Sequence, residues 1–200
     1  MMRFLDGKVP GLLPFVPPFL KVRQVGDRAD REHPRLARPA AVARLARRSS
    51  RLAAHQLQLT IADLVAEVHD THHPIASSLY YEDQRREARR RAPLFLRERV
   101  PKFLGYFEQV LARKRGSRGK HLVGVRTSYV DLSLFQIVEG LRYAFPRAMS
   151  RIERKNPRVV ALHDAVAARP RIARHLDSDR RISFNEEGIF RHYPELDAVR

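Results

Sequence analysis

Histidine side chains gather near the end of a predicted helix, where they could bind a metal ion. His69, His72 and His73 lie beside Asp70, and imidazoles together with a carboxylate are common zinc ligands. However, His73 directly precedes Pro74, and no distant ligand pattern completes the set. A histidine in the last turn of a helix is equally explained by its favourable interaction with the helix dipole. We therefore predict no metal site.

Three acids follow one face of the same predicted helix. Asp63, Glu67 and Asp70 are spaced i, i+4 and i+7, which could pair carboxylates for general acid–base catalysis. Charged residues at this spacing more commonly form the solvated or interfacial face of an amphipathic helix. We expect this second arrangement.

A strongly basic run extends over residues 85–126. It holds fourteen Lys or Arg and three Glu, a balance that favours contact with nucleic acid or another polyanion. Binding of single-stranded nucleic acid also uses exposed aromatic side chains for stacking. Phe95, Phe103, Tyr106 and Phe107 instead follow the apolar stripe of a helix. We therefore predict a solvated basic face and do not expect a nucleic-acid partner.

Composition limits the class of protein that carries these residues. The 200 residues include 39 Lys or Arg against 22 Asp or Glu, a formal net charge of +17, and no Cys. Disulfides, thiolate zinc sites and cysteine nucleophiles are thereby excluded. With 44% hydrophobic residues, the chain can form a globular core. The early apolar stretch, residues 9–20, contains four prolines, so we predict no membrane span or signal segment and a cytoplasmic location.

Helical periodicity begins at Leu52. A first helix is predicted from Leu52 to the residues before Pro74, because the residue preceding proline disfavours helical backbone. A second helical region covers about residues 83–114, and Pro93 and Pro101 are expected to kink or break it. The stripe predicted to be buried in it comprises Phe95, Leu96, Val100, Phe103, Leu104, Phe107, Val110 and Leu111.

The next helix has the clearest start signal in the chain. Ser128 precedes Asp131 by three residues, ahead of an apolar run that continues to Phe145, an arrangement typical of a capping box. Pro157 and Pro170 are expected to begin two further helices, because proline suits the first helical position. No strand alternation of useful length appears after residue 50.

Residues 52–200 resemble the C-terminal helical domain of glutathione S-transferases, most closely the sigma-like bacterial type. Residues 124–132, Gly-Val-Arg-Thr-Ser-Tyr-Val-Asp-Leu, are similar to the family's Gly-x-x-x-(Ser/Thr)-x-x-Asp capping motif. Segments 103–107 and 122–124 before the motif and segment 162–170 after it have the spacing of the family. The resemblance implies an all-α glutathione-transferase-type bundle with a remnant of a thioredoxin-like α/β domain. It gives Ser128 and Asp131 a structural capping role.

The resemblance also implies binding roles. The helix end that carries His69 and His72, with Tyr80 and Tyr81 beyond it, would lie along the groove that holds a hydrophobic electrophile. The helix would pack at a homodimer interface and could contact glutathione in the partner subunit. We choose Asp63 for that contact.

Residues 1–51 are expected to form an incomplete glutathione-binding domain. Residues 16–21, Val-Pro-Pro-Phe-Leu-Lys, are similar to the family strand whose cis-proline presents backbone to glutathione. Pro18 would be that proline, with Pro17 beside it, whereas a proline-rich loop is the alternative. The family's catalytic Tyr, Ser or Cys would precede residue 1, so no catalytic residue is assigned in this chain.

Residues 22–50 depart from the family pattern. Nine arginines, three acids and few large apolar residues lie between positions 22 and 51, so we expect poor order there. Where the family has a Gln-Thr-Ala-Asn-Ile-like run, residues 29–39 read Ala-Asp-Arg-Glu-His-Pro-Arg-Leu-Ala-Arg-Pro. One permitted codon series for them, read one base later, encodes Gln-Thr-Ala-Asn-Ile-Leu-Ala-Trp-Leu-Gly. We interpret the segment as translated out of frame, with a genuine basic arm as the alternative.

These observations predict a glutathione S-transferase family protein. A complete relative would transfer the thiolate of glutathione, its co-substrate, to an electrophilic small molecule in detoxification. This chain is expected to be impaired because the segment that carries the catalytic residue is missing. The alternatives are a basic helical domain that binds nucleic acid or other polyanions, and a non-catalytic scaffold.

Overall fold

The computed structural model describes residues 39–113 and 119–197, with side chains from residue 48 onward. Pro17, Pro18 and the expected strand at residues 16–21 lie outside this range. The described residues hold helices, turns and irregular segments and no strand, which confirms the predicted all-α class. The chain divides into residues 1–46 and 47–200, and the core and cavities described below lie in the second unit.

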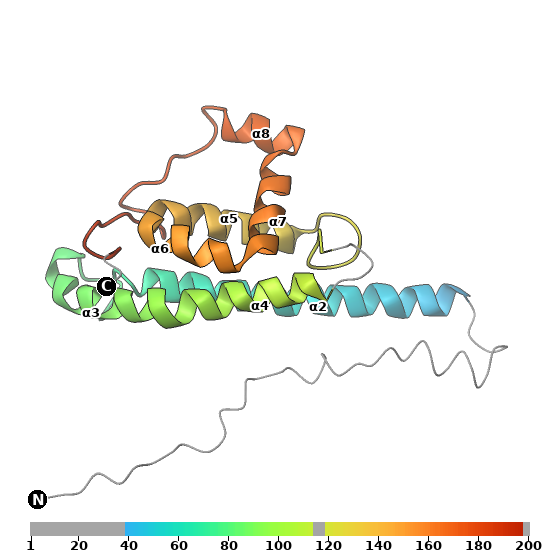
Figure 1. Ribbon diagram of the computed structural model, residues 1–200, viewed down its shortest axis with the longest axis horizontal. Coiled ribbons are helices and arrows are strands. Elements are labelled where there is room, and N and C mark those ends of the chain that lie inside the picture. Colours follow the sequence, from blue (N-terminus) through green and yellow to red (C-terminus); the bar gives the residue numbers. More distant parts are fainter. Residues whose placement is uncertain (1–38, 114–118, 198–200) are drawn as a thin grey trace, which may run out of the picture. The chain divides into compact units, whose positions relative to one another are not determined.

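Seven α-helices follow one another along the described residues (Figure 1). Short 3-10 turns, Glu82–Gln84 and Glu153–Lys155, precede α3 and follow α6. The helices are α2 (Pro39–His69), α3 (Arg85–Leu94), α4 (Val100–Ala112), α5 (Tyr129–Ala144), α6 (Pro146–Ile152), α7 (Pro157–Ala167) and α8 (Pro170–Leu176).

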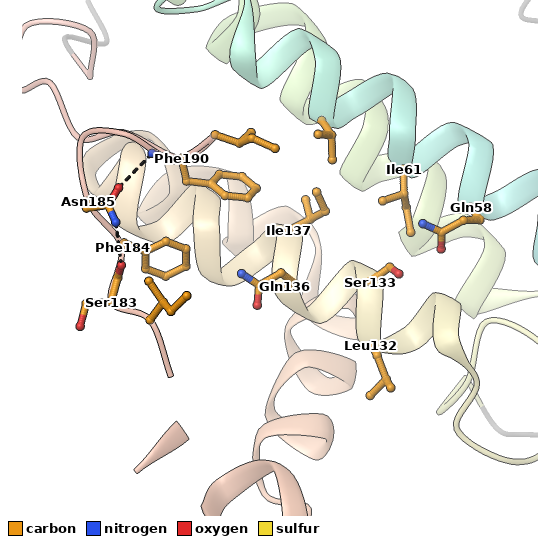
Figure 2. A pocket seen from close by; sticks show the side chains of 14 residues that line it. Gln58, Ile61, Leu132, Ser133, Gln136, Ile137, Ser183, Phe184, Asn185 and Phe190 are labelled. Atoms are coloured by element: carbon orange, nitrogen blue, oxygen red, sulfur yellow. Dashed lines mark hydrogen bonds between the residues drawn. The ribbon is translucent and has the colours of Figure 1, made fainter. Parts of the chain in front are cut away.

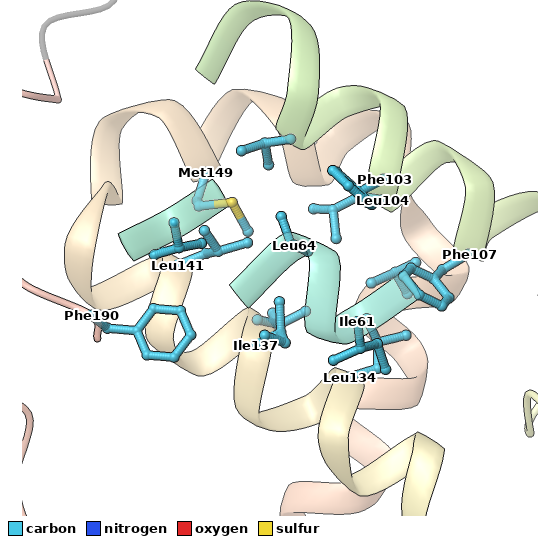
Figure 3. Packing of buried hydrophobic residues seen from close by; sticks show 14 of the residues in the cluster. Ile61, Leu64, Phe103, Leu104, Phe107, Leu134, Ile137, Leu141, Met149 and Phe190 are labelled. Carbon is cyan, nitrogen blue, oxygen red and sulfur yellow. The ribbon is translucent and has the colours of Figure 1, made fainter. Parts of the chain in front are cut away.

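Apolar stripes of α2, α4 and α5 meet in one hydrophobic core. Leu64 of α2, Leu104 of α4 and Leu134 of α5 are each fully buried, and Figure 3 shows them converging from the three helices. Both α4 and α5 also pack against α7. The predicted stripe of the second helical region is buried except for Val110, which packs on the core while remaining partly exposed.

The helix α2 begins at Pro39, well before the predicted start at Leu52. Proline suits the first position of a helix because its missing N–H needs no partner there. Four alanines between residues 40 and 46 then give the segment a high helix propensity. The predicted end before Pro74 is confirmed, since α2 ends at His69.

The second helical region continues past Pro93 and Pro101 without a break, through a wider helical turn between them. A five-residue π-helical segment, Phe95–Arg99, joins α3 to α4 between the two prolines. The N–H of Val100 donates to the carbonyl oxygen of Phe95, five residues earlier, which is the π-helical bond. Because Pro101 has no N–H to donate, the wider turn lets the helical path continue.

A capping box begins α5. The N–H and hydroxyl of Ser128 donate to Oδ2 of Asp131 at 2.7 and 2.8 Å, and the N–H of Leu122 donates to Oδ1 at 2.8 Å. Asp131 is fully buried, so these three bonds replace the water that its carboxylate loses. They also tie the preceding loop to α5.

Prolines begin the last three helices. Pro157 of α7 and Pro170 of α8 occupy the predicted first positions. Helix α6 was not predicted as a separate element, although Pro146 begins it in the same way. The chain bends between Ala144 and Pro146 because the residue before a proline disfavours the helical region.

Candidate functional site

The irregular stretch after α8, residues 177–197, is here named the C-terminal segment. It returns from α8 to the neighbourhood of α6 (Figure 1). The ring of Phe190 lies against the backbone of α5 at Gly140, where a Cβ would come within 2.3 Å of the Phe190 Cγ. Only glycine at position 140 therefore permits this contact without a shift of the ring.

Polar contacts hold the far end of the C-terminal segment. The buried carboxylate of Asp197 accepts hydrogen bonds from the N–H groups of Arg147 and Ala148, at 2.7 and 3.0 Å, in the first turn of α6. The Nδ1 of His192 lies 3.1 Å from the carbonyl oxygen of Ala144. These contacts fix both the segment and the bend between α5 and α6.

A cavity of about 610 Å³ lies between α2, α5 and the C-terminal segment. Its lining is mainly apolar, and Figure 2 shows Ile61 on α2 and Ile137 on α5 facing it together with Phe184 and Phe190. This volume and lining are typical of a site for a small apolar molecule. The complete lining is Gln58, Ile61, Val65, Leu132, Ser133, Gln136, Ile137, Ile182, Ser183, Phe184, Asn185, Gly188, Ile189 and Phe190.

One polar atom in this lining lacks a partner. The Oε1 atom of Gln58 is buried and accepts no hydrogen bond among the described residues. An unpaired buried amide oxygen is unfavourable, and it can accept a hydrogen bond from a molecule in the cavity. Ser133 and Gln136 place further polar groups on the α5 side (Figure 2).

His72 lies behind the wall of the cavity and does not line it. The side chain is 1% exposed, and its Nε2–H donates to the carbonyl oxygen of Ile189 at 2.9 Å. Its Nδ1 is buried without a partner. Burial, opposed by the bond to Ile189 and reinforced by the charge of Arg191, lowers the pKa of His72 to about 4. The fold therefore holds this imidazole in the neutral form.

Tyr81 likewise contacts the C-terminal segment. Its ring stacks on that of Tyr193 with centroids 3.8 Å apart, and its hydroxyl donates to Oε1 of Glu195 at 3.1 Å. Arg85 also donates to Glu195, at 2.8 Å. Burial and the bond to Glu195 raise the pKa of Tyr81 to about 12. Neither His72 nor Tyr81 lines this cavity.

The other residues predicted near the acceptor groove have different surroundings. Tyr80 is 79% exposed, and His69 stacks on His73 with ring centroids 4.8 Å apart. The Nδ1 of His73 accepts a hydrogen bond from Gln84 at 2.9 Å. Burial and the charges of Arg191 and His69 lower the pKa of His73. No group of three or more His, Cys, Asp or Glu among the described residues could hold a metal ion.

The acidic face of α2 is partly occupied by arginines. Glu67 accepts two hydrogen bonds from the Nε of Arg99, at 2.8 and 3.0 Å. Asp70 lies 3.7 Å from Arg91. Asp63 is exposed and does not line the cavity. The three acids therefore do not form a shared catalytic centre.

The basic run has its aromatic residues inside the fold. Phe95, Phe103 and Phe107 are buried, and Tyr106 packs against the core while partly exposed. The arginines of α3 are exposed. This side-chain arrangement matches the predicted solvated face.

A charged network that the sequence did not indicate joins α5 to α7 and to the C-terminal segment. Glu139 accepts hydrogen bonds from His163 at 2.8 Å and from Arg181 at 2.9 Å. Burial opposes ionisation of Glu139, but the bonds from His163 and Arg181 lower its pKa. Arg181 belongs to the C-terminal segment, so the network holds the start of this segment on α5.

A second cavity, of about 420 Å³, adjoins the first. It lies between α5, α8 and the start of the C-terminal segment. Its complete lining is Leu132, Phe135, Gln136, Ile172, His175, Leu176, Arg180, Arg181, Ile182 and Phe184.

Comparison with known protein families accounts for the helical unit. A family model described as glutathione S-transferase, C-terminal domain, matches residues 69–179, which is more than half of the chain and includes α3 to α8. A search of curated proteins finds no match. None of the described helices is long and apolar enough to cross a membrane. The chain belongs to the glutathione S-transferase C-terminal domain family.

Proposed function

We propose that this chain is a glutathione transferase family member whose helical unit binds an apolar electrophile in the larger cavity. The observation that carries this proposal is the 610 Å³ space with a mainly apolar lining on a domain of this family. Such a cavity removes apolar surface of a ligand from water, which favours binding. Glutathione is the proposed co-substrate because the family uses it.

The proposed reaction forms a bond between the glutathione sulfur and an electrophilic carbon of the acceptor. The thiol proton is released to solvent, and a displaced group leaves with the electron pair of its former bond to carbon. The cavity contributes by fixing the acceptor's apolar body, which reduces the entropy cost of the encounter. The unpaired Oε1 of Gln58 would accept a hydrogen bond from an acceptor that carries a donor.

In this proposal His72 and Tyr81 act through the cavity wall. His72 fixes Ile189, which lines the cavity, and Tyr81 fixes the segment further on through Tyr193 and Glu195. They would thereby position the surface that an acceptor contacts. His69 and Tyr80 are proposed to line the groove for the electrophile, and the support for them is the resemblance to the family.

Contacts to glutathione remain proposals of the same kind. Asp63 is exposed on α2, so a second subunit could reach it, while Pro17 and Pro18 are proposed from their motif. The family also supports a homodimer and a cytoplasmic location.

Retention of the full chain on immobilised glutathione tests the transferase proposal. The expected result is retention that free glutathione reverses and that is unchanged between low and high salt. Release by salt alone would instead favour binding to polyanions through the basic run, because such binding weakens steeply with salt, and would contradict the proposal. Formation of a conjugate with chlorodinitrobenzene then tests turnover, which we expect to be impaired because no catalytic residue is assigned in this chain.

A further inference from the structure

Several arginines of the basic run at residues 85–126 lie close to acids in the structure. The pairs are Arg85 and Arg89 with Glu195, Arg91 with Asp70, Arg97 with Glu98, and Arg99 with Glu67. A neighbouring carboxylate cancels much of the field that an arginine presents to solvent. The basic run therefore attracts an anionic partner less strongly than its sequence indicates.

A second group of basic residues, which we name the α6 stripe, lacks such acids. It comprises Arg147 and Arg151 of α6 and Arg154 and Lys155 of the 3-10 turn that follows. The spacing i, i+4, i+7 and i+8 places these residues on one side of the helical path. All four side chains are exposed, and none forms an ion pair within the part of the chain that the structure describes.

The acids nearest to the α6 stripe in the structure are already engaged. Glu153, the only acid between residues 144 and 163, accepts hydrogen bonds from Arg142 of α5 at 2.6 and 3.2 Å. Asp197 is buried against the first turn of α6, where it accepts two backbone N–H groups. These bonds also attach α6 and the 3-10 turn to their neighbours, so a fixed backbone carries the four cations.

The surroundings of the α6 stripe favour a phosphate backbone as its partner. Residues 133–181 contribute none of the large apolar side chains that are exposed on the described part of the chain. A protein interface has an apolar centre, and single-stranded nucleic acid or a membrane surface is bound with exposed aromatic or apolar side chains. Contacts to the backbone of a duplex require only cations and other hydrogen-bond donors.

The length of the α6 stripe also suits a duplex. A helical path from Arg147 to Lys155 rises by about 12 Å. Successive phosphates of one strand are roughly 3.4 Å apart along the axis of a duplex, so the stripe extends over about three or four phosphates. The guanidinium groups of its arginines match the geometry of phosphate oxygens.

We propose that the α6 stripe binds the phosphate backbone of duplex nucleic acid without reading its sequence. Each cation that contacts a phosphate releases counterions, which makes the binding weak at high salt. The proposal does not rest on the transferase proposal, because no residue of the stripe lines the larger cavity. It assigns no nucleic-acid contact to the basic run at residues 85–126.

Two triple variants of the full chain with equal net charge test the proposal. Arg147→Gln/Arg151→Gln/Arg154→Gln removes three cations of the α6 stripe. Arg86→Gln/Arg90→Gln/Lys102→Gln removes three exposed cations of the basic run that likewise have no acidic partner among the described side chains. Fluorescence anisotropy with a labelled DNA duplex of about 20 base pairs measures the dissociation constant at several salt concentrations, and circular dichroism checks that both variants are folded.

The α6 variant should weaken binding at least about ten-fold at roughly 0.1 M salt, and the slope of log affinity against log salt should become shallower by about 2 to 3. The control variant should change the dissociation constant by less than about two-fold. Arg147→Lys/Arg151→Lys/Arg154→Lys should retain most of the affinity, because it keeps the charge.

Three results would overturn the proposal. The first is no binding of the duplex by the native chain, and the second is an equal loss of affinity in the two triple variants. The third is displacement of the duplex by polyglutamate or by phosphatidylserine vesicles at the same concentration of charge, which would indicate an acidic protein or a membrane as the partner.

Discussion

The core of α2, α4 and α5 and the C-terminal segment are held in place by different physical means. The core relies on continuous apolar packing around side chains such as Leu64, Leu104 and Leu134, all fully buried. The segment has no regular secondary structure after α8 and depends on a few contacts, including Phe190 on Gly140 and His72 on Ile189. The difference indicates that the core determines global stability, whereas the segment determines the shape of the cavities.

The largest expected effect comes from opening the core. Leu134→Ala should lower the free energy of unfolding by about 3 kcal/mol, because it removes a fully buried side chain and leaves a cavity. Urea denaturation measures this change. Leu94→Ala, at a position 47% exposed in α3, should lower the free energy by much less. Equal losses would contradict the assignment of the core.

The capping residue of α5 should come next. Asp131→Ala removes the acceptor for Ser128 and for the buried N–H of Leu122, so we expect about 2 kcal/mol of lost stability. Asp131→Asn retains an acceptor oxygen and should lose less. Urea denaturation of both variants checks the order, and an alanine variant as stable as the native chain would refute a structural role for this carboxylate.

These core features are also those that the sequence predicts well. The spacing of Ser128 and Asp131, the apolar stripe that includes Leu104, and the first-position prolines of α7 and α8 are local signals, and the structure contains each of them. The prolines in the second helical region also mark the place of the π-helical segment.

The candidate site was much less predictable. Phe190 and Gly140, which contact each other, are fifty residues apart in the sequence. His72 and Ile189 are 117 residues apart. Neither contact can therefore be detected from local periodicity. A glycine inside an apolar helical pattern often marks a close approach, and Gly140 was the available signal. The sequence predicts that His72 and Tyr81 line the groove, whereas in the structure they contact the C-terminal segment outside the cavity.

Gly140→Ala should disturb the C-terminal segment while leaving the stability of the core almost unchanged. Its Cβ would lie 2.3 Å from the ring of Phe190, so the ring and the C-terminal segment must shift. Alanine has a higher helix propensity than glycine by about 1 kcal/mol. This gain offsets the cost of moving the ring, so the free energy of unfolding should change little. Exchange of the Leu196 amide hydrogen, which is bonded to the carbonyl oxygen of Tyr193 at 2.8 Å, should become faster.

Gly105→Ala provides the matched control for that experiment. Gly105 lies in α4, and a Cβ there would meet nothing within 4 Å. It offers the same gain in helix propensity without touching the segment. Equal exchange rates in the two variants would contradict the anchoring role of Gly140.

The buried histidines also predict that the stability of the fold depends on pH. The pKa of His72 is lowered to about 4 from 6.5, and the pKa of His73 is lowered as well. The unfolded chain therefore binds more protons than the fold between about pH 6.5 and 4, so stability should fall as the pH drops through this range.

His72→Gln tests the origin of this slope. Glutamine can still donate to the carbonyl oxygen of Ile189 but does not titrate, so the loss of stability on acidification should be smaller. Urea denaturation at several pH values between 7 and 4 measures both proteins. Identical slopes would show that His72 does not cause the dependence.

The proposed binding of an apolar electrophile in the larger cavity can be measured by equilibrium dialysis with chlorodinitrobenzene. Val65 lines this cavity from α2, whereas Leu59 on the same helix is exposed and lines neither cavity. We expect Val65→Phe to weaken binding about ten-fold by occupying the space, and Leu59→Phe to leave binding unchanged. No binding by the native chain, or equal binding by the two variants, would contradict the claim.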